Sequence, residues 1–144
     1  MRSYWLQQAL ADDDAAITPL DGDRRVDICI VGGGYTGLWT ALNLKEHNPS
    51  LDIAIIDADI CGGGASGRNG GFCMTWMSKA ATLIKLCGAQ EGVRLLRESH
   101  NAVAAIGQFC ADHGIDAHFR HDGWLWTAGN AVQVGAWSET LEQL

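Results

Sequence analysis

The 144-residue chain is 47% hydrophobic, which is enough to build a real core in one soluble domain. Its 17 acidic residues outnumber its 10 lysines and arginines, and the formal charge of -7 argues against nucleic acid and anionic membrane surfaces as partners. No stretch approaches the roughly 18 apolar residues that a membrane-spanning helix needs, so we expect no membrane span and a cytoplasmic protein.

The first 24 residues precede any clear element. They carry the acidic run Asp12-Asp13-Asp14 and the polar stretch "DGDRR", and they show no sustained periodicity. We therefore expect residues 1–24 to form an N-terminal tail that lies on the surface.

A strand, a helix and a second strand follow in order. The apolar run "VDICIV" at 26–31 and the run "LDIAIID" at 51–57 are typical of buried strands. Between them, residues 36–47 have helical spacing, and "NPS" supplies the stop. This order predicts an α/β fold: a Rossmann-like βαβ unit, the first part of a doubly wound parallel sheet with a right-handed crossover.

The glycines after the first strand fit a dinucleotide-binding fingerprint. Gly32 would make the tight turn, Gly34 would let a pyrophosphate approach the backbone, and Gly37 would let helix and strand pack closely. The helix that begins near Thr36 would point its free N–H groups at the phosphates. Asp57 ends the second strand, where its carboxylate can accept hydrogen bonds from ribose hydroxyls. The fingerprint alone leaves open whether the dinucleotide carries a nicotinamide or a flavin, and a turn that serves only packing would leave Asp57 unexplained.

The remaining chain alternates between loose and periodic stretches. The glycine-rich "CGGGASGRNGGF" predicts a loop, either shaped or flexible, and residues 88–113 predict a helix. "DAHFR" and "GWLWTA" predict a β-hairpin, and the last residues predict a helix that begins at an Asn cap. Trp124 and Trp126 would share one strand face, as the wall of a substrate pocket or as ordinary sheet packing.

Metal binding is not expected. The five cysteines form no C-x-x-C pair, so we expect buried free thiols rather than a disulfide framework. His113, His118 and His121 are close in sequence, but the predicted hairpin would not make them converge.

The stretch "GASGRNGG" resembles the loop after the second strand in the D-amino-acid-oxidase-like (DAO) family of FAD-dependent oxidoreductases. "VGGGYTGLWTAL", "IIDADICGGGASGRNGG" and "HGIDAHFRHDGWLWTA" resemble its amine-oxidising members in particular. The resemblance runs from about Ser3 to the last residue. It implies FAD as cofactor and a small-molecule amine or amino acid as substrate, oxidised by hydride transfer to the flavin.

The resemblance also implies roles for individual residues. Backbone at Gly34, Tyr35 and Thr36 would meet the pyrophosphate, and Asp57 would bind the adenosine ribose where many members have Glu. The residues that match the loop around the middle of FAD are Ser66, Arg68, Asn69, Gly70 and Gly71. None of the residues present is assigned as catalytic.

Family members are far longer than this sequence, so we expect an N-terminal part that is inactive alone. After the tail, residues 25–87 would form the FAD-binding βαβ unit and flavin loop, and residues 88–144 the beginning of an α+β substrate domain. The remainder of the polypeptide, or a partner chain, would complete the fold. Two alternatives stay open: part of an NAD(P)-dependent dehydrogenase, and a non-catalytic nucleotide-binding module or subunit of a split flavoenzyme.

Overall fold

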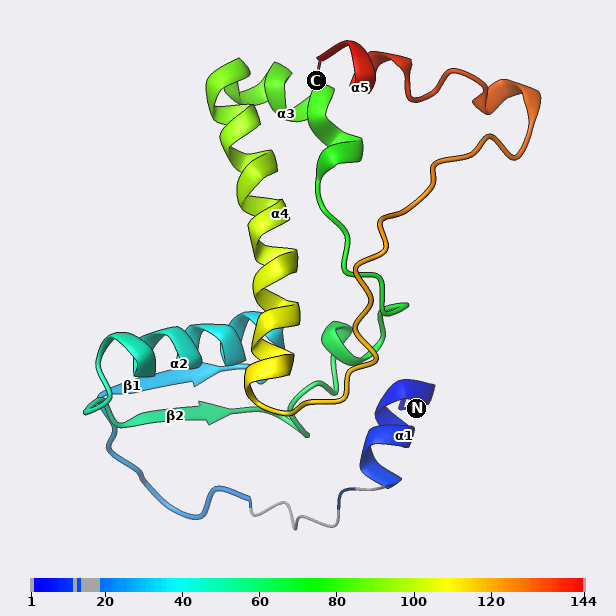
Figure 1. Cartoon of the computed structure of the whole chain (residues 1–144). Helices are drawn as coiled ribbons and strands as arrows, with labels where there is room; N and C mark the ends of the chain where they lie inside the picture. Colours follow the sequence, from blue (N-terminus) through cyan, green and yellow to red (C-terminus); the bar gives the residue numbers. More distant parts are fainter. Residues whose placement is uncertain (1, 12, 14–18, 144) are drawn as a thin grey trace. The chain divides into compact units, whose positions relative to one another are not determined.

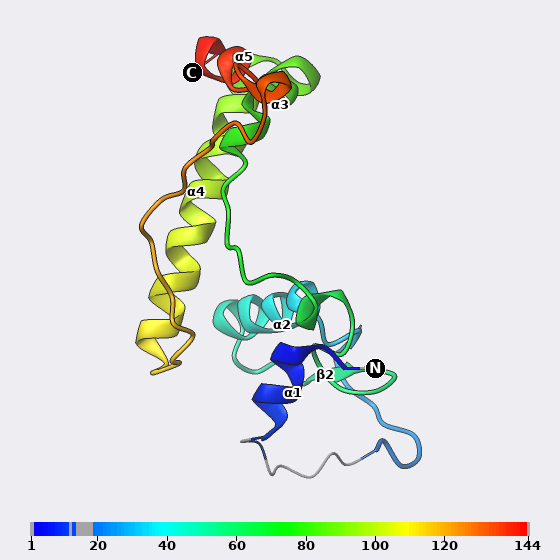
Figure 2. The same ribbon diagram turned by 90° about the vertical axis from the view of Figure 1, so that its right-hand side faces the viewer.

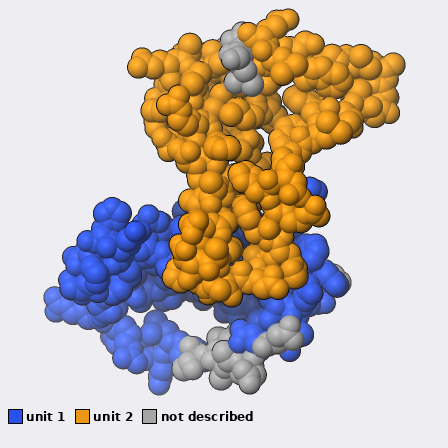
Figure 3. Space-filling model, viewed as in Figure 1, with its two compact units in different colours: residues 1–72 blue, residues 73–144 orange. Residues whose placement is uncertain are grey.

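The computed structural model describes residues 2–11, 13 and 19–143. The chain divides into two compact units, residues 1–72 and residues 73–144, coloured blue and orange in Figure 3.

The first unit contains a small parallel sheet covered by a helix (Figure 1). Its strands pair in register, with Ile28 opposite Ile53 and Val31 opposite Ile56. The predicted order of strand, helix and parallel strand is therefore confirmed. The elements are α1 (Tyr4–Ala11), β1 (Ile28–Val31), α2 (Tyr35–His47), β2 (Ile53–Ile56) and a 3-10 helix at Ala65–Gly67.

The end of α2 shows why the helix stops where the sequence predicts. Asn48 has extended backbone, and its N–H donates to the carbonyl of Leu44 at 2.9 Å. The Lys45 ammonium donates to the carbonyls of Pro49 at 2.5 Å and Leu51 at 3.0 Å. These bonds satisfy carbonyls at the end of the helix and in the turn that leads into β2.

The strands are more exposed than predicted. Side chains along β1 alternate between half-buried and exposed, and Val31 is 82% exposed. Ile56 in β2 is 37% exposed. A parallel sheet is normally covered on both faces by helices, and here α2 packs on both described strands but none of their side chains is buried. The prediction of buried strands is therefore wrong for this chain.

Residues 1–24 contain a short helix that was not predicted. In α1 the N–H of Gln7 donates to the carbonyl of Ser3 at 2.9 Å, and the N–H of Leu6 donates to the Ser3 hydroxyl at 3.2 Å. An eight-residue helix is marginal by itself, and its sequence lacks a long apolar stripe. No side chain of α1 is buried, as expected for a surface segment, whereas Asp12 and Asp14 lie outside the described residues.

The second unit is mainly helical. Its longest helix confirms the prediction for residues 88–113, and Leu96 and Val103 on its apolar face are buried. A Cβ at Gly92 would lie 2.9 Å from the Cα of Ile84, so this long helix and the helix before it in the chain pack backbone to backbone at this point. The elements are a 3-10 helix at Met77–Lys79, α3 (Ala80–Cys87), α4 (Ala89–Asp112), a 3-10 helix at Ala131–Gln133 and α5 (Ser138–Gln143).

The predicted hairpin is absent, because no residue from 115 to 128 belongs to a strand. His118 has φ +48, a left-handed conformation that interrupts an extended run. The Phe119 ring lies against α4, where a Cβ at Gly107 would be 2.4 Å from it. Figures 1 and 2 both show this segment running back along α4. Packing on the helix has taken the place of strand pairing.

The C-terminal segment follows its prediction in part. The Asn130 side chain accepts hydrogen bonds from the N–H groups of Val132 at 3.0 Å and Gln133 at 3.2 Å, which confirms the Asn cap. The helix then breaks at Gly135, which has φ +83, and a separate helix, α5, begins at Ser138. Glycine tolerates this left-handed backbone, so it separates the two turns of helix.

All five cysteines are free thiols, but they are not buried as predicted. Four are exposed and Cys110 is half-buried. The segments that contain them have too little structure packed over them to exclude water. Among the helices of the described residues, none is both long enough and apolar enough to cross a membrane.

Candidate dinucleotide-binding site

The first glycine turn joins the end of β1 to the start of α2. Gly32 has φ +106, and its N–H donates to the carbonyl of Ile56 at 2.7 Å. A Cβ at Gly37 would lie 2.1 Å from the Gly32 carbonyl oxygen and 3.2 Å from Cγ2 of Ile30. These positions agree with the turn and close-packing roles predicted for Gly32 and Gly37.

Asp57 folds back onto this turn from the end of β2. Its Oδ2 accepts the N–H of Gly33 at 2.8 Å, and its Oδ1 accepts the N–H of Asp59 at 3.1 Å. The bond from Gly33, followed by that from Asp59, holds the pKa of the Asp57 carboxyl below its ordinary value, although partial desolvation opposes them. Each carboxylate oxygen keeps a lone pair that can accept another hydrogen bond, so the predicted ribose contact fits the geometry.

The second glycine loop, residues 61–71, packs into the first, residues 32–37. The Ser66 hydroxyl oxygen accepts the N–H of Tyr35 at 2.9 Å, at the first residue of α2. Gly34, the residue before the helix, has no side chain that could make this capping bond. A Cβ at Gly34 would lie 2.8 Å from the Ser66 hydroxyl. Ser66 therefore caps α2 from a distant part of the chain, and the bare backbone of Gly34 makes room for it.

A second set of contacts locks the same two loops together. The Gly62 N–H donates to the Gly33 carbonyl at 2.9 Å, and a Cβ at Gly33 would lie 2.3 Å from the sulfur of Cys61. Because Gly33 and Cys61 are far apart in the chain, no local sequence pattern indicates that Gly33 must be glycine to make room for Cys61. Gly33 is thus a required glycine outside the three fingerprint positions.

Asn69 orders the end of the second loop. Its side-chain amide donates to the Ser66 carbonyl at 2.6 Å and to the Tyr35 hydroxyl at 3.3 Å. Its Oδ1 accepts the N–H of Gly71 at 2.8 Å, and Gly71 has φ +78. Beyond Gly70, whose Cβ would make only an ordinary contact with the Phe72 ring, the loop has little covering it. Asn69 thus shapes the backbone of the loop.

Two of the groups predicted to bind the cofactor have no hydrogen-bond partner among the described residues and are therefore available to a ligand. The Arg68 guanidinium is exposed and makes no hydrogen bond or ion pair with any other described residue. The N–H of Thr36, in the first turn of α2, has no acceptor within the part of the chain that the structure describes. A fixed cation and an open N–H at a helix start are the groups that bind a diphosphate.

The N-terminal segment adds contacts that sequence reasoning missed. The Ser3 hydroxyl donates to the carbonyl of Gly67, and the Arg2 guanidinium lies 3.6 Å from the Asp59 carboxylate. No motif marks these residues, so only the fold could bring them to the second loop.

The structure therefore brings together Tyr35, Asp57, Ser66 and Asn69 around one turn. The Arg68 side chain makes no ion pair with any other described residue.

A metal site is not seen at this turn or elsewhere in the described residues, where no three His, Cys, Asp or Glu side chains gather in a way that could hold an ion. The site is built from glycine backbone, a carboxylate, a hydroxyl and a guanidinium. This set of groups suits an organic ligand with a diphosphate and a ribose.

Comparison with protein families identifies the class. The profile of the DAO family, described as FAD dependent oxidoreductase, matches residues 27–144. The chain belongs to this family, whose cofactor is FAD. The match favours a flavin over the nicotinamide alternative that the first glycine turn left open.

Curated proteins with similar sequences are also named as oxidoreductases. A protein of Rhizobium meliloti named probable oxidoreductase OrdL is 38% identical over 104 residues, which cover 69% of this chain and 23% of that protein. Gamma-glutamylputrescine oxidoreductase of Escherichia coli is 33% identical over 135 residues, or 93% of this chain and 31% of the enzyme. The chain thus spans about a quarter to a third of the length of these relatives. No solved structure matches it significantly.

Proposed function

We propose that the chain is the cofactor-binding part of an FAD-dependent enzyme that oxidises an amine or an amino acid. The observation that carries this proposal is the interlocked pair of glycine loops, with Ser66 bound to the N–H of Tyr35 at 2.9 Å. The relative named gamma-glutamylputrescine oxidoreductase supports an amine as the donor class. These loops provide a backbone surface for a diphosphate and a carboxylate for a ribose.

The residues would divide the work of holding FAD. Backbone at Gly34, Tyr35 and Thr36 would face the pyrophosphate. Ser66 accepts the Tyr35 N–H, and its own O–H proton is donated to no described residue, so it can be given to a phosphate oxygen. Gly32 and Gly37 would shape the turn that brings this backbone to the ligand.

The other loop residues would act by charge and shape. The carboxylate of Asp57, whose pKa the N–H of Gly33 holds below its ordinary value, would accept hydrogen bonds from the ribose hydroxyls of the adenosine half. Arg68 would place a positive charge near the diphosphate, and Asn69 would hold the backbone of Gly70 and Gly71 close to the middle of the cofactor.

The redox chemistry belongs to the cofactor. FAD held by these residues would supply the hydride acceptor for oxidation at the carbon next to the substrate nitrogen. The chain's residues bind and orient FAD for this reaction, and none of them is assigned as a catalytic base.

Further polypeptide, from the same chain or a partner, would complete the fold. Val31 is 82% exposed at the end of β1, where a covered parallel sheet would bury it. We expect the 144-residue chain alone to bind FAD weakly and to lack activity. A cytoplasmic location is part of the proposal, on the basis of composition.

The test compares the 144-residue chain alone with the same chain completed by further polypeptide, either any additional residues that its reading frame encodes or a partner chain. We expect only the completed protein to retain stoichiometric flavin, and an amine or amino acid to bleach its visible flavin band without oxygen. A completed protein that takes up NAD(H) and no flavin would overturn the proposal. Stoichiometric flavin on the 144-residue chain would contradict the expected need for further polypeptide.

A further inference from the structure

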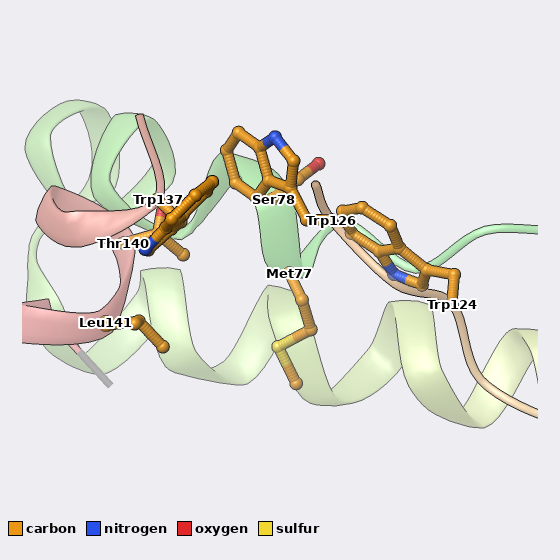
Figure 4. Close-up of a pocket in the computed structure, with 7 residues that line it drawn as sticks. All are labelled: Met77, Ser78, Trp124, Trp126, Trp137, Thr140 and Leu141. Carbon is orange, nitrogen blue, oxygen red and sulfur yellow. The ribbon is translucent and has the colours of Figure 1, made fainter. Parts of the chain in front are cut away.

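A pocket in the second unit is walled by aromatic side chains (Figure 4). Its volume is about 340 Å³, which is within the range of small-molecule sites. We call it the tryptophan pocket. Its lining includes Ser78, Trp124, Trp126, Trp137 and Thr140.

Three indole rings give the pocket its character. The Trp126 ring lies between the others, 5.9 Å from Trp124 in a stacked arrangement and 6.3 Å from Trp137 in an edge-on arrangement. Trp124 is 47% exposed and Trp126 is 38% exposed, so a ligand can reach their rings. The sequence offered a pocket wall and sheet packing as roles for these two residues. With no strand present, the first role fits the structure.

The polar groups of the pocket are uncharged. No charged side chain lines it, and its hydroxyls belong to Ser78 and Thr140. Neither hydroxyl has a hydrogen-bond partner among the described residues, although both are half-buried. Their oxygens are therefore available to accept hydrogen bonds from a ligand.

We propose that the tryptophan pocket binds the ammonium group of an amine. The face of an indole ring attracts cations more strongly than other aromatic rings do, and the free hydroxyl oxygens can accept N–H groups. A neutral apolar ligand would leave those hydroxyls unpaired, and an anion would find no cationic side chain on the walls. The formal charge of -7 also favours a cation. The inference rests on the proposed function only in taking the bound amine as the substrate.

The test compares n-butylammonium with butan-1-ol, which has a similar shape and no charge. Binding to the 144-residue chain is followed through the NMR signals of the six indole N–H groups. We expect the amine to shift the signals of Trp124, Trp126 and Trp137 and to leave those of Trp5 and Trp39 unchanged. We expect about tenfold weaker binding of the alcohol. Equal binding of the two ligands, or shifts confined to other tryptophans, would overturn the proposal.

Variants at the central ring sharpen the test. Trp126→Leu removes the aromatic face and should weaken n-butylammonium binding about tenfold, whereas Trp126→Phe keeps a ring and should lose less. Trp5→Leu, in the other unit, is the control and should bind as the unchanged chain does. If Trp126→Leu fails to fold, equal affinity of Trp126→Phe for the amine and the alcohol would still overturn the proposal.

The ammonium test needs no flavin, so it is separate from the test of the proposed function. A chain that binds n-butylammonium in the pocket while its completed form takes up no FAD would support the pocket and overturn the proposed oxidase. If the completed protein binds FAD but n-butylammonium does not shift its indole signals, the proposed ammonium site is wrong and the proposed function is unaffected.

Discussion

The glycine loops of the first unit and the aromatic stretch at residues 115–128 differ in what holds their backbone. In the loops, a side chain at Gly33, Gly34 or Gly37 would collide with neighbouring atoms at 2.8 Å or less. In the aromatic stretch no residue belongs to a strand, and Phe119 packs its ring on α4. Close backbone packing leaves the glycine loops only one backbone conformation. The aromatic stretch is held by side-chain contacts, so its backbone conformation depends on which surface its rings can pack against.

The largest effect should come from Gly37→Ala. The new Cβ would lie 2.1 Å from the Gly32 carbonyl oxygen, and that backbone atom cannot move without opening the turn. We expect a loss of about 3 kcal/mol in the free energy of unfolding, at the upper end for overpacking. Urea denaturation followed by circular dichroism measures it.

Two other glycines provide comparisons for Gly37→Ala. Gly64 has negative φ and open space around its Cβ position, so Gly64→Ala should change stability little. At Gly107 the obstacle is the Phe119 ring, which can turn, and alanine favours a helix by about 1 kcal/mol, so Gly107→Ala should cost much less than Gly37→Ala. Equal losses at Gly37 and Gly64 would show that the turn is not tightly packed.

A smaller effect should reveal the contact between the two loops. In Gly34→Ala the new methyl would lie 2.8 Å from the Ser66 hydroxyl, and we expect a loss of about 1 to 2 kcal/mol. Ser66→Ala should itself cost about 1 kcal/mol, because the Tyr35 N–H loses its cap. The remaining Ser66 Cβ would lie 3.8 Å away, an ordinary contact, so the double variant should lose less than the sum.

Urea denaturation of all four proteins measures this coupling. We expect about 1 kcal/mol of favourable interaction between the two changes. If the losses in the free energy of unfolding were additive, contact with Ser66 would not be the reason why position 34 requires glycine. In that case the pyrophosphate alone would explain this position of the fingerprint.

The same contrast explains what could be predicted from the sequence. The runs that became β1 and β2 are short, apolar and rich in isoleucine, and glycine marks the turn after β1, so β1, α2 and β2 were predicted within a few residues, whereas α1 was not. The bond from Tyr35 to Ser66 joins residues 31 positions apart, and no local pattern encodes it. The prediction of a hairpin was wrong because an isolated pair of strands is only marginally stable, and Phe119 packs on α4 instead.

The smallest effect should come from Asp57→Asn, and it depends on pH. Because its pKa in the folded chain lies below the ordinary value of 3.8, the carboxylate stabilises the fold above that value. This stabilisation disappears as the pH falls through the folded-state pKa. Thermal melting of the two proteins should therefore differ near neutral pH and converge in strong acid. Asp23→Asn is the matched control, since that exposed carboxylate has no partner among the described residues. If the difference between Asp57→Asn and the unchanged chain were the same at every pH, the ionised carboxylate would not hold Gly33, and the first turn would depend on its glycine contacts alone.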